Sequence, residues 1–306
     1  MNLSFVPIPL LFIISNVGCI IANTIKSYYI KKNCEKTSQY YSINGFIFLF
    51  CALSIFVFNG FKFSISLYSF LLALLFGAIN MAYAVINSYC IKIGPYGYTM
   101  LISYLSTGFT AISGAIFWDE KLTILKIVGI VLMLVCFVLS VDTSTKDKKT
   151  SIKWLIFCIV SLILMASVGI VQKIHQSNAV YANELNEFLV VAFFTSTILL
   201  FALYPYFLNK EKKDLIALSE NKKPKVSRYL VFLIIMMIIG MSASINNVFN
   251  LFLSGKVETA IFFPISNGIP LLASLIVSLV LYKEKLKVKQ HLGLIVGVIA
   301  IVILFF

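Results

Sequence analysis

Asparagine recurs at helical spacing within the long apolar stretches of this 306-residue chain. Asn16 and Asn23 are seven residues apart, as are Asn80 and Asn87, so each pair lies on one face of a helix. An asparagine amide without a hydrogen bond in lipid is costly, so these faces are expected to point into a helix bundle. There they could bind a polar ligand or join helices, the latter contributing roughly 0.6–2 kcal/mol per hydrogen bond. For one asparagine both roles stay open, but the number of such residues favours a polar cavity.

Six of the apolar stretches contribute polar side chains that are expected to line this cavity. The candidate substrate-binding residues are Asn16, Asn23, Asn80, Tyr83, Asn87, Ser103, Tyr104, Gln172, Asn246, Asn250, Ser266 and Asn267. Pro264 and Pro270 lie in the same stretch as the last two, and each removes a backbone hydrogen bond from a helix. Interrupted helices are typical of transporter binding sites, although a proline can also simply kink a helix.

Three carboxylates lie at the edges of apolar stretches, where a carboxylate could carry a proton. Glu187 lies about one turn into its stretch and is the proton-coupling candidate, with pairing to the dipole of the helix N-terminus as the alternative. Glu120 and Glu284 stand beside lysines and just before a helix, so we expect them to face water as structural corners that bind nothing. Lys26 and Lys173 come late in their stretches, and their side chains are expected to extend to the membrane interface.

Sequence motifs for catalysis or metal binding are missing from the chain. It contains no HExxH, GxSxG or GxxxxGK[ST] and no cluster of histidine with cysteine. Its six cysteines are scattered without a CxxC pair, and most lie in apolar stretches, where they resemble small buried side chains. We therefore expect neither an enzyme nor a metal ion or other cofactor.

The composition indicates a chain that lives in a lipid bilayer. Hydrophobic residues make up 60% of it and charged residues 12%, and the mean hydropathy is +0.98. A soluble domain has about 45–50% apolar and about 25% charged residues. The apolar residues come in runs of about 20, the length of a helix that crosses a bilayer, rather than the shorter alternating segments of a barrel. The net charge of +13 arises from lysines in short loops without a basic face, so nucleic acid is not an expected partner.

Ten transmembrane helices are predicted, which makes the fold class an all-α polytopic membrane protein. Their approximate ranges are 4–28, 38–59, 66–91, 97–117, 123–141, 152–174, 184–207, 228–252, 258–281 and 288–306.

An internal repeat divides these helices into two sets of five. The phrase FWDEKLTILKIVG, residues 117–129, returns as LYKEKLKVKQHLG, residues 281–293, at an offset of 164. We place the first repeat at 1–142, a central loop at 143–151 and the second repeat at 152–306. Because five is odd, the second set must enter from the opposite side of the membrane. Such inverted-topology repeats are a recurrent design of secondary transporters.

The lysines and arginines of the loops predict the orientation. Of the 25 basic residues, 20 lie at the loops of one face and five at the loops of the other. Because cytoplasmic loops are enriched in basic residues, this count places both termini outside, in a multi-pass protein of a cell membrane, plasma or inner.

The repeated phrase resembles the EamA-type half of the drug/metabolite transporter superfamily. The likeness rests on Trp118–Thr123, on Tyr282–Val288 and on PLLASLIVSLVLYKEKL, which begins at Pro270. It covers nearly the whole chain in helix number and repeat. It departs from the pattern at Ser106, where the second copy has Pro270, and at Val288, where the first has Thr123.

The resemblance implies a ten-helix architecture in which helices 123–141 and 288–306 form a scaffold and the other eight enclose a path. Small residues such as Gly129, and Gly293 with Gly297, suit close packing in that scaffold. The resemblance also implies cytoplasmic termini, against the charge count, which we follow here.

Together these features predict a secondary transporter that works by alternating access, as a monomer or a homodimer. Its substrate is expected to be a small polar metabolite, neutral or zwitterionic: an amino acid, a nucleobase or a nucleoside. One alternative is a proton-coupled exporter of cationic drugs or amines that uses Glu187 and cation–π contacts. A scaffold or lipid-handling subunit is a third reading, but it would not need polar faces on several helices.

Overall fold

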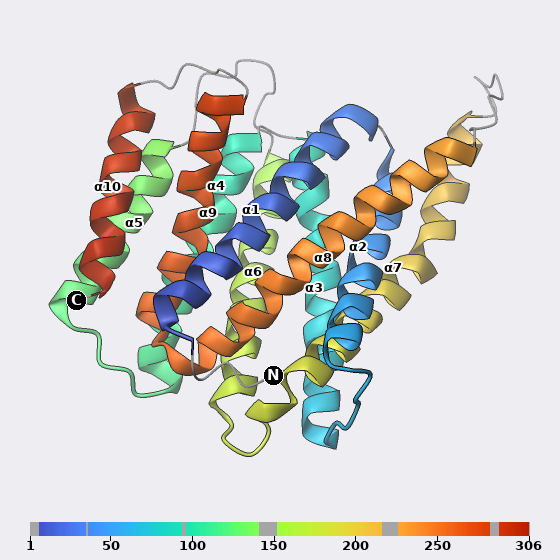
Figure 1. The fold of residues 1–306 in the computed structure, drawn as a ribbon. Coiled ribbons are helices and arrows are strands. Elements are labelled where there is room, and N and C mark those ends of the chain that lie inside the picture. Colours follow the sequence, from blue (N-terminus) through green and yellow to red (C-terminus); the bar gives the residue numbers. More distant parts are fainter. Residues whose placement is uncertain are drawn as a thin grey trace.

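The computed structural model describes residues 6–34, 36–93, 96–140, 152–215, 226–281 and 288–305. It gives the backbone alone at residues 31, 32, 91, 92, 96–98, 100, 101, 104, 140, 212–215, 226–228, 274–281 and 305. Every regular element in the described ranges is a helix, which confirms the all-helical prediction (Figure 1). These elements are α1 (Ile8–Asn33), α2 (Thr37–Phe58), α3 (Leu67–Ile93), α4 (Tyr96–Phe117), α5 (Ile124–Ser140), α6 (Ile152–Ser177), the 3-10 helix η1 (Ala182–Glu184), α7 (Leu185–Leu215), α8 (Val226–Lys256), α9 (Thr259–Leu281) and α10 (Val288–Phe305).

The boundaries of most helices lie within a few residues of the predicted apolar stretches. α7 departs most, because it was expected to end at residue 207 and continues to Leu215. Its last two turns are rich in lysine and glutamate, which favour a helix although they are not apolar. The hydropathy pattern therefore predicted the apolar part of α7 but not the residue at which the helix ends.

Six of the helices are long and apolar enough to cross a membrane. They contain the spans Ile8–Ile30, Thr37–Phe58, Leu67–Cys90, Ile152–Ser177, Ala182–Glu211 and Tyr229–Lys256. Four shorter apolar segments, in α4, α5, α9 and α10, complete the set in the described part of the chain. These lengths are consistent with a multi-pass membrane protein.

The outer surface is as apolar as the interior. On α5, for example, Ile127, Val131, Val135 and Val138 recur every three or four residues and are all exposed. Many serines, threonines and asparagines are buried instead. This distribution suits a bundle whose outside contacts lipid tails rather than water.

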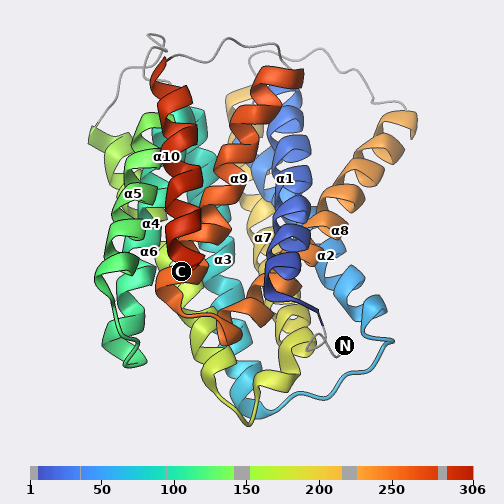
Figure 2. The same ribbon diagram turned by 60° about the vertical axis from the view of Figure 1, so that its left-hand side comes forward.

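Each helix of the first five packs against helices of the last five. α1 packs mainly on α8 and α5 on α10, whereas α2 packs on α7 and α8, α3 on α7 and α6, and α4 on α6 and α9. α5 and α10 stand together at one side of the bundle, and both described ends of the chain lie toward the same end of it (Figures 1 and 2). The two halves of the sequence are thus interleaved rather than separate bodies.

Glycines allow the closest of these approaches. A methyl group on Gly129 would lie 2.7 Å from Leu304, and one on Gly297 would lie 2.6 Å from the sulfur of Cys136, so both glycines serve the α5–α10 contact as expected. At Gly77 of α3 a methyl group would overlap the backbone oxygen of Ala192 of α7. The backbone of α7 cannot move away from an added methyl group by a change of rotamer, as a flexible side chain could.

Gly77→Ala is therefore expected to destabilise the bundle by about 1–3 kcal/mol, because α3 and α7 must separate. Gly108→Ala is the matched control, since its methyl group would lie 3.6 Å from Leu134, an ordinary contact. Thermal unfolding in detergent measures both. Equal melting temperatures for the two variants would contradict the close α3–α7 approach.

Candidate functional site

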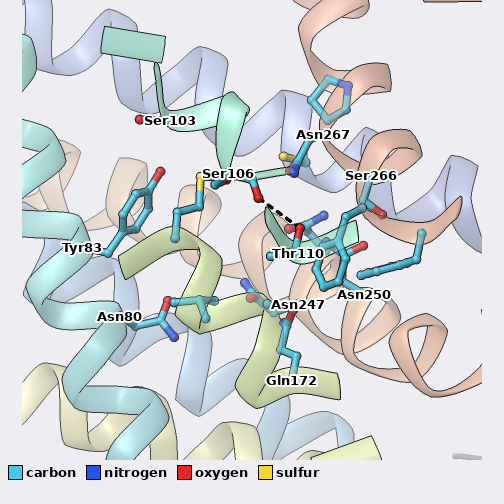
Figure 3. Close-up of a pocket in the computed structure, with 18 of the residues that line it drawn as sticks. Asn80, Tyr83, Ser103, Ser106, Thr110, Gln172, Asn247, Asn250, Ser266 and Asn267 are labelled. Atoms are coloured by element: carbon cyan, nitrogen blue, oxygen red, sulfur yellow. Dashed lines mark hydrogen bonds between the residues drawn. The ribbon is translucent and has the colours of Figure 1, made fainter. Parts of the chain in front are cut away.

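A cavity of about 280 Å³ lies between α1, α3 and α4 of the first set and α6, α8 and α9 of the second (Figure 3). Its wall is formed by Cys19, Asn23, Asn80, Tyr83, Ser103, Ser106, Thr110, Met165, Val168, Gly169, Gln172, Asn246, Asn247, Asn250, Phe262, Phe263, Ser266, Asn267 and Pro270. None of these lining residues is an aspartate, glutamate, lysine, arginine or histidine. The wall is therefore uncharged, and it combines amide and hydroxyl groups with apolar side chains.

Nine of the twelve candidate substrate-binding residues line this one cavity. They are Asn23, Asn80, Tyr83, Ser103, Gln172, Asn246, Asn250, Ser266 and Asn267. The side chain of Tyr104 lies outside the described residues. Asn16 and Asn87 are not part of the wall.

Asn16 and Asn87 lie on the same helix faces as the lining residues Asn23 and Asn80, but at other positions along the helix axis. Seven residues of α-helix span about 10 Å, so Asn16 lies nearer the start of α1 than Asn23, and Asn87 nearer the end of α3 than Asn80. Asn16 donates from its amide to the backbone oxygen of Phe12 at 2.7 Å and is buried. The seven-residue spacing therefore predicted the helix face of these asparagines correctly, but it did not predict where along the helix the cavity lies.

Backbone carbonyls of the preceding turn orient two asparagines of the wall. Asn80 Nδ2 donates to the oxygen of Phe76 at 3.2 Å, and Asn247 Nδ2 donates to the oxygen of Ala243 at 2.8 Å. One of the two amide N–H groups is thereby used, which leaves the side-chain carbonyl oxygen and the second N–H. Asn267 is held similarly, because its Nδ2 donates to Thr107 Oγ1 at 2.7 Å.

The contact between α1 and α8 combines helix packing with cavity lining. Asn246 Nδ2 donates to the backbone oxygen of Ser15 at 3.1 Å and to its hydroxyl at 3.0 Å. The Ser15 hydroxyl in turn donates to Asn250 Oδ1 at 2.8 Å. Joining helices and lining a cavity were weighed as alternatives for these asparagines, and Asn246 and Asn250 do both.

Ser266 presents a hydroxyl that the protein does not use. Its Oγ is buried and has no hydrogen-bond partner among the described residues, and the residue lines the cavity (Figure 3). A buried hydroxyl without a partner costs about 1–3 kcal/mol. In this rotamer the oxygen is not exposed to the cavity, so it would reach a ligand there by rotating about the Cα–Cβ bond.

Part of the wall was not anticipated from the sequence. Ser106 and Thr110 follow Ser103 at helical spacing, so their face of α4 could have been recognised. A hydroxyl in a helix can bond to its own backbone, as Thr110 does to Ser106, and is therefore a weak signal of a site. Phe262 and Phe263 gave no signal, since lipid-facing helices are equally rich in phenylalanine.

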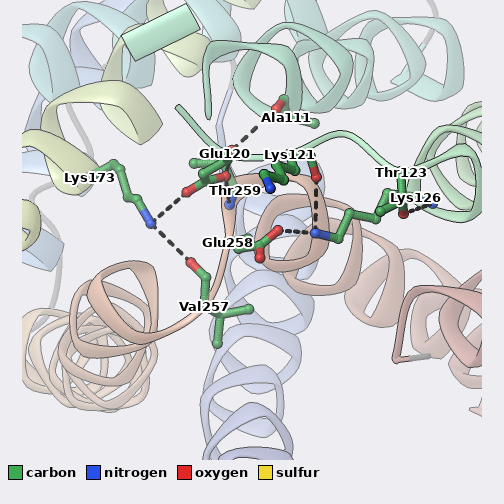
Figure 4. A network of polar contacts seen from close by, with 9 residues as sticks. All are labelled: Ala111, Glu120, Lys121, Thr123, Lys126, Lys173, Val257, Glu258 and Thr259. Atoms are coloured by element: carbon green, nitrogen blue, oxygen red, sulfur yellow. Dashed lines mark hydrogen bonds and ion pairs between the residues drawn. The ribbon is translucent and has the colours of Figure 1, made fainter. Parts of the chain in front are cut away.

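Glu120 forms a buried ion pair one turn beyond the cavity wall (Figure 4). Its Oε1 lies 3.0 Å from Lys173 Nζ, and each of the two side chains is 9% exposed. Lys173 directly follows the lining residue Gln172 and also donates to the oxygen of Val257 at 3.1 Å. The expectations that Glu120 faces water and that Lys173 reaches the interface are wrong.

The start of α9 explains why Glu120 turns inward. Its Oε2 accepts hydrogen bonds from the backbone nitrogen and the hydroxyl of Thr259, both at 2.7 Å. The first amides of a helix lack intrahelical partners and attract negative charge. Gly114 leaves the room, because a side chain there would overlap Thr259 and Glu120. Glu120 therefore caps α9 and not the following α5; Glu284 lies outside the described residues.

A second ion pair at the same corner is more exposed. Lys126 of α5 pairs with Glu258, and the two side chains are 17% and 45% exposed. Lys126 also donates to the backbone oxygen of Lys121 at 3.2 Å. This pair and the Glu120–Thr259 hydrogen bonds link the α4–α5 corner to the start of α9, and the buried pair links it to α6 (Figure 4).

Glu187 does not line the cavity. Its Oε1 accepts a hydrogen bond from Asn59 Nδ2 at 2.7 Å, and Asn186 Nδ2 donates to Asn59 Oδ1 at 2.9 Å. Asn59 follows the end of α2, so this cluster fastens the α2–α3 connection to the start of α7. The position suits an anchor between helix ends better than a group that exchanges protons with a bound solute.

Comparisons with known proteins identify a fold and no function. No protein-family model and no curated protein matches the chain. Among 28 matching chains of solved structures is one titled "Crystal structure of protein". It superimposes with a TM-score of 0.69 over 97% of this chain and 98% of its own, at 10% sequence identity. At this identity the likeness concerns the fold alone, so function has to be argued from the cavity.

Proposed function

We propose that the protein is a secondary active transporter of a small polar organic metabolite, neutral or zwitterionic. The observation that supports this is the uncharged polar cavity between helices of both sets. A cavity enclosed by two sets of helices can open to either side when one set moves against the other. Amides from five helices lie around this one space, which suits the binding of a polar solute.

The helix pairing supports an inverted repeat of ten spans. Exchanging each helix with its counterpart five places along turns the α1–α8 contact into α6–α3, and α2–α8 into α7–α3. All four of these contacts are present, as are α4–α6 and its counterpart α9–α1. With the 164-residue offset of the repeated phrase, this pairing favours two halves related by a pseudo-two-fold axis. It also favours the ten-helix drug/metabolite transporter architecture.

The position of α5 and α10 in the bundle supports their proposed role as a scaffold. They pack mainly on each other, and neither contributes a residue to the cavity wall. On this proposal the path runs among the other eight helices. The Glu120–Lys173 pair, which joins the two sets beside the cavity, breaks when that end opens.

The alternative reading as an exporter of cationic drugs finds less support. It would need a carboxylate facing the solute, and the described cavity wall offers none. Glu187, its expected proton carrier, is bonded to Asn59 instead.

A thermal-shift screen against neutral, zwitterionic and cationic metabolites tests the substrate class. A ligand that binds only the folded protein at 100 times its dissociation constant adds about 2.7 kcal/mol, which raises the melting temperature measurably. We expect shifts with neutral or zwitterionic solutes. Shifts confined to organic cations would favour the exporter.

The basic loops lead us to propose that both termini lie outside the cytoplasm. A reporter that is active only in the cytoplasm, fused after Phe306, is then expected to be silent. The same reporter inserted in the central loop, between residues 143 and 151, is expected to be active. The reverse pattern would place the termini inside.

A further inference from the structure

The cavity wall carries several hydrogen-bond acceptors that have no partner among the described residues. Asn80, Asn247 and Asn267 each donate one amide N–H to a protein oxygen, which leaves the Oδ1 acceptor and a second N–H of each side chain. No hydrogen bond to these three oxygens is found in the described part of the chain. A solute with N–H groups would satisfy them.

The same cavity wall also carries hydrogen-bond donors. The Ser266 hydroxyl is buried without a partner among the described residues, and Asn250 uses its Oδ1 on Ser15, which leaves its Nδ2. The side chain of Gln172 is 7% exposed and has no hydrogen bond to any described residue. The wall therefore offers amide-type acceptors and donors together, the pattern that complements an N–H beside a C=O.

Apolar side chains complete the wall. Phe262 and Phe263 are buried in an edge-to-face contact, with ring centroids 4.8 Å apart, and Met165 and Val168 also line the cavity. Gly169 makes room for the Phe263 ring, because a methyl group there would lie 2.6 Å from it. Aromatic faces combined with asparagine or glutamine amides are the means by which proteins recognise nucleobases.

The lack of charged side chains in the cavity wall favours an uncharged solute over an amino acid. A zwitterion would bring a carboxylate and an ammonium into a wall without a charged side chain, and burying an unpaired ion costs several kcal/mol. The charges of Lys173, which directly follows the lining residue Gln172, and of Glu120 already pair with each other. An uncharged solute avoids this cost.

The volume of the cavity sets an upper limit on the size of the solute. Pockets for drug-sized ligands measure about 300–1,000 Å³, and this cavity of about 280 Å³ is smaller. From these features we infer that the cavity binds an uncharged planar heterocycle with an amide-like edge, of which a nucleobase is the simplest case. The inference rests on the proposed transport function and narrows its substrate class.

Equilibrium dialysis of the purified protein with radiolabelled uracil and adenine tests the inference. At least one of them is expected to bind more tightly than L-glutamine or L-leucine. 1,3-Dimethyluracil keeps the ring but lacks both N–H groups, so it is expected to bind about 100-fold more weakly than uracil.

Ser266→Ala tests the site itself. The lost hydroxyl has no protein partner among the described residues, so the variant is expected to fold as stably as the wild type. The affinity for the bound nucleobase should fall about tenfold, the effect of one hydrogen bond. Ser161→Ala is the matched control, because Ser161 Oγ is equally buried and unpartnered there but lies outside the cavity wall.

The outcomes separate this inference from the proposed function. Binding of a nucleobase that Ser266→Ala weakens and Ser161→Ala leaves unchanged supports both. Binding of an amino acid without a nucleobase overturns the inference and leaves the transporter proposal standing. Binding of organic cations only, or of no solute in the panel, overturns both.

Discussion

Replacing Glu120 by alanine is expected to lower the free energy of unfolding by about 3–5 kcal/mol. The variant leaves the ammonium of Lys173 in a buried place without its counter-charge, and removing one partner of a buried pair has effects of that size. It also removes the acceptor for the backbone nitrogen and hydroxyl of Thr259 at the start of α9. Reversible unfolding in mixed micelles measures the change.

Two further variants separate the buried pair from a general effect of charge. Glu258→Gln breaks the more exposed pair with Lys126 and is expected to cost less than about 1 kcal/mol. Glu120→Gln combined with Lys173→Met removes both charges and should recover most of the loss from Glu120→Ala. A cost below about 1 kcal/mol for Glu120→Ala would mean that water screens the pair.

Ser266→Phe is expected to lower uptake about 10- to 100-fold while the bundle remains folded. The added ring would occupy a cavity of about 280 Å³ that must otherwise hold the solute. Forcing a solute past it costs about 1–3 kcal/mol or more, which corresponds to a loss of about 10- to 100-fold in uptake. Initial uptake rates in proteoliposomes provide the measurement.

Ala202→Phe adds the same bulk on the exposed surface of α7 and serves as the control. Its uptake should equal that of the wild type. If Ser266→Phe transported as fast as this control, the solute would have to cross the protein by another route.

Much of the fold followed from one physical requirement, since a helix that crosses a bilayer needs about 20 apolar residues. The start of α6 at Ile152 and the starts of α9 and α10 were located to within a residue for this reason. The end of α7 was not, because lysine and glutamate continue a helix as readily outside the membrane as within a soluble domain.

The cavity could be predicted in part. Periodicity identified Asn23 and Asn80 on inward faces, and both line it. Periodicity carries no information on depth, so Asn16 and Asn87 were placed with them although each lies about two turns away along its helix. The unpaired hydroxyl of Ser266 could not have been foreseen, since it depends on which helices surround it.

Glu120 illustrates what local sequence cannot supply. Its neighbours Asp119 and Lys121 suggest a corner in water. Its real partners, Lys173 and Thr259, are 53 and 139 residues away along the chain. Only the packing of α4, α6 and α9 brings them together, so the burial of this carboxylate is a property of the fold.

Uptake by proteoliposomes tests the central claim most directly. Wild-type protein, the Ser266→Phe variant and protein-free liposomes would be compared with radiolabelled uracil, adenine, uridine, L-glutamine, L-leucine and an organic cation. The account predicts that wild-type protein accumulates at least one neutral or zwitterionic solute and that uptake by Ser266→Phe is about 10- to 100-fold lower. Uptake of the organic cation alone, or of none of these solutes, would contradict it.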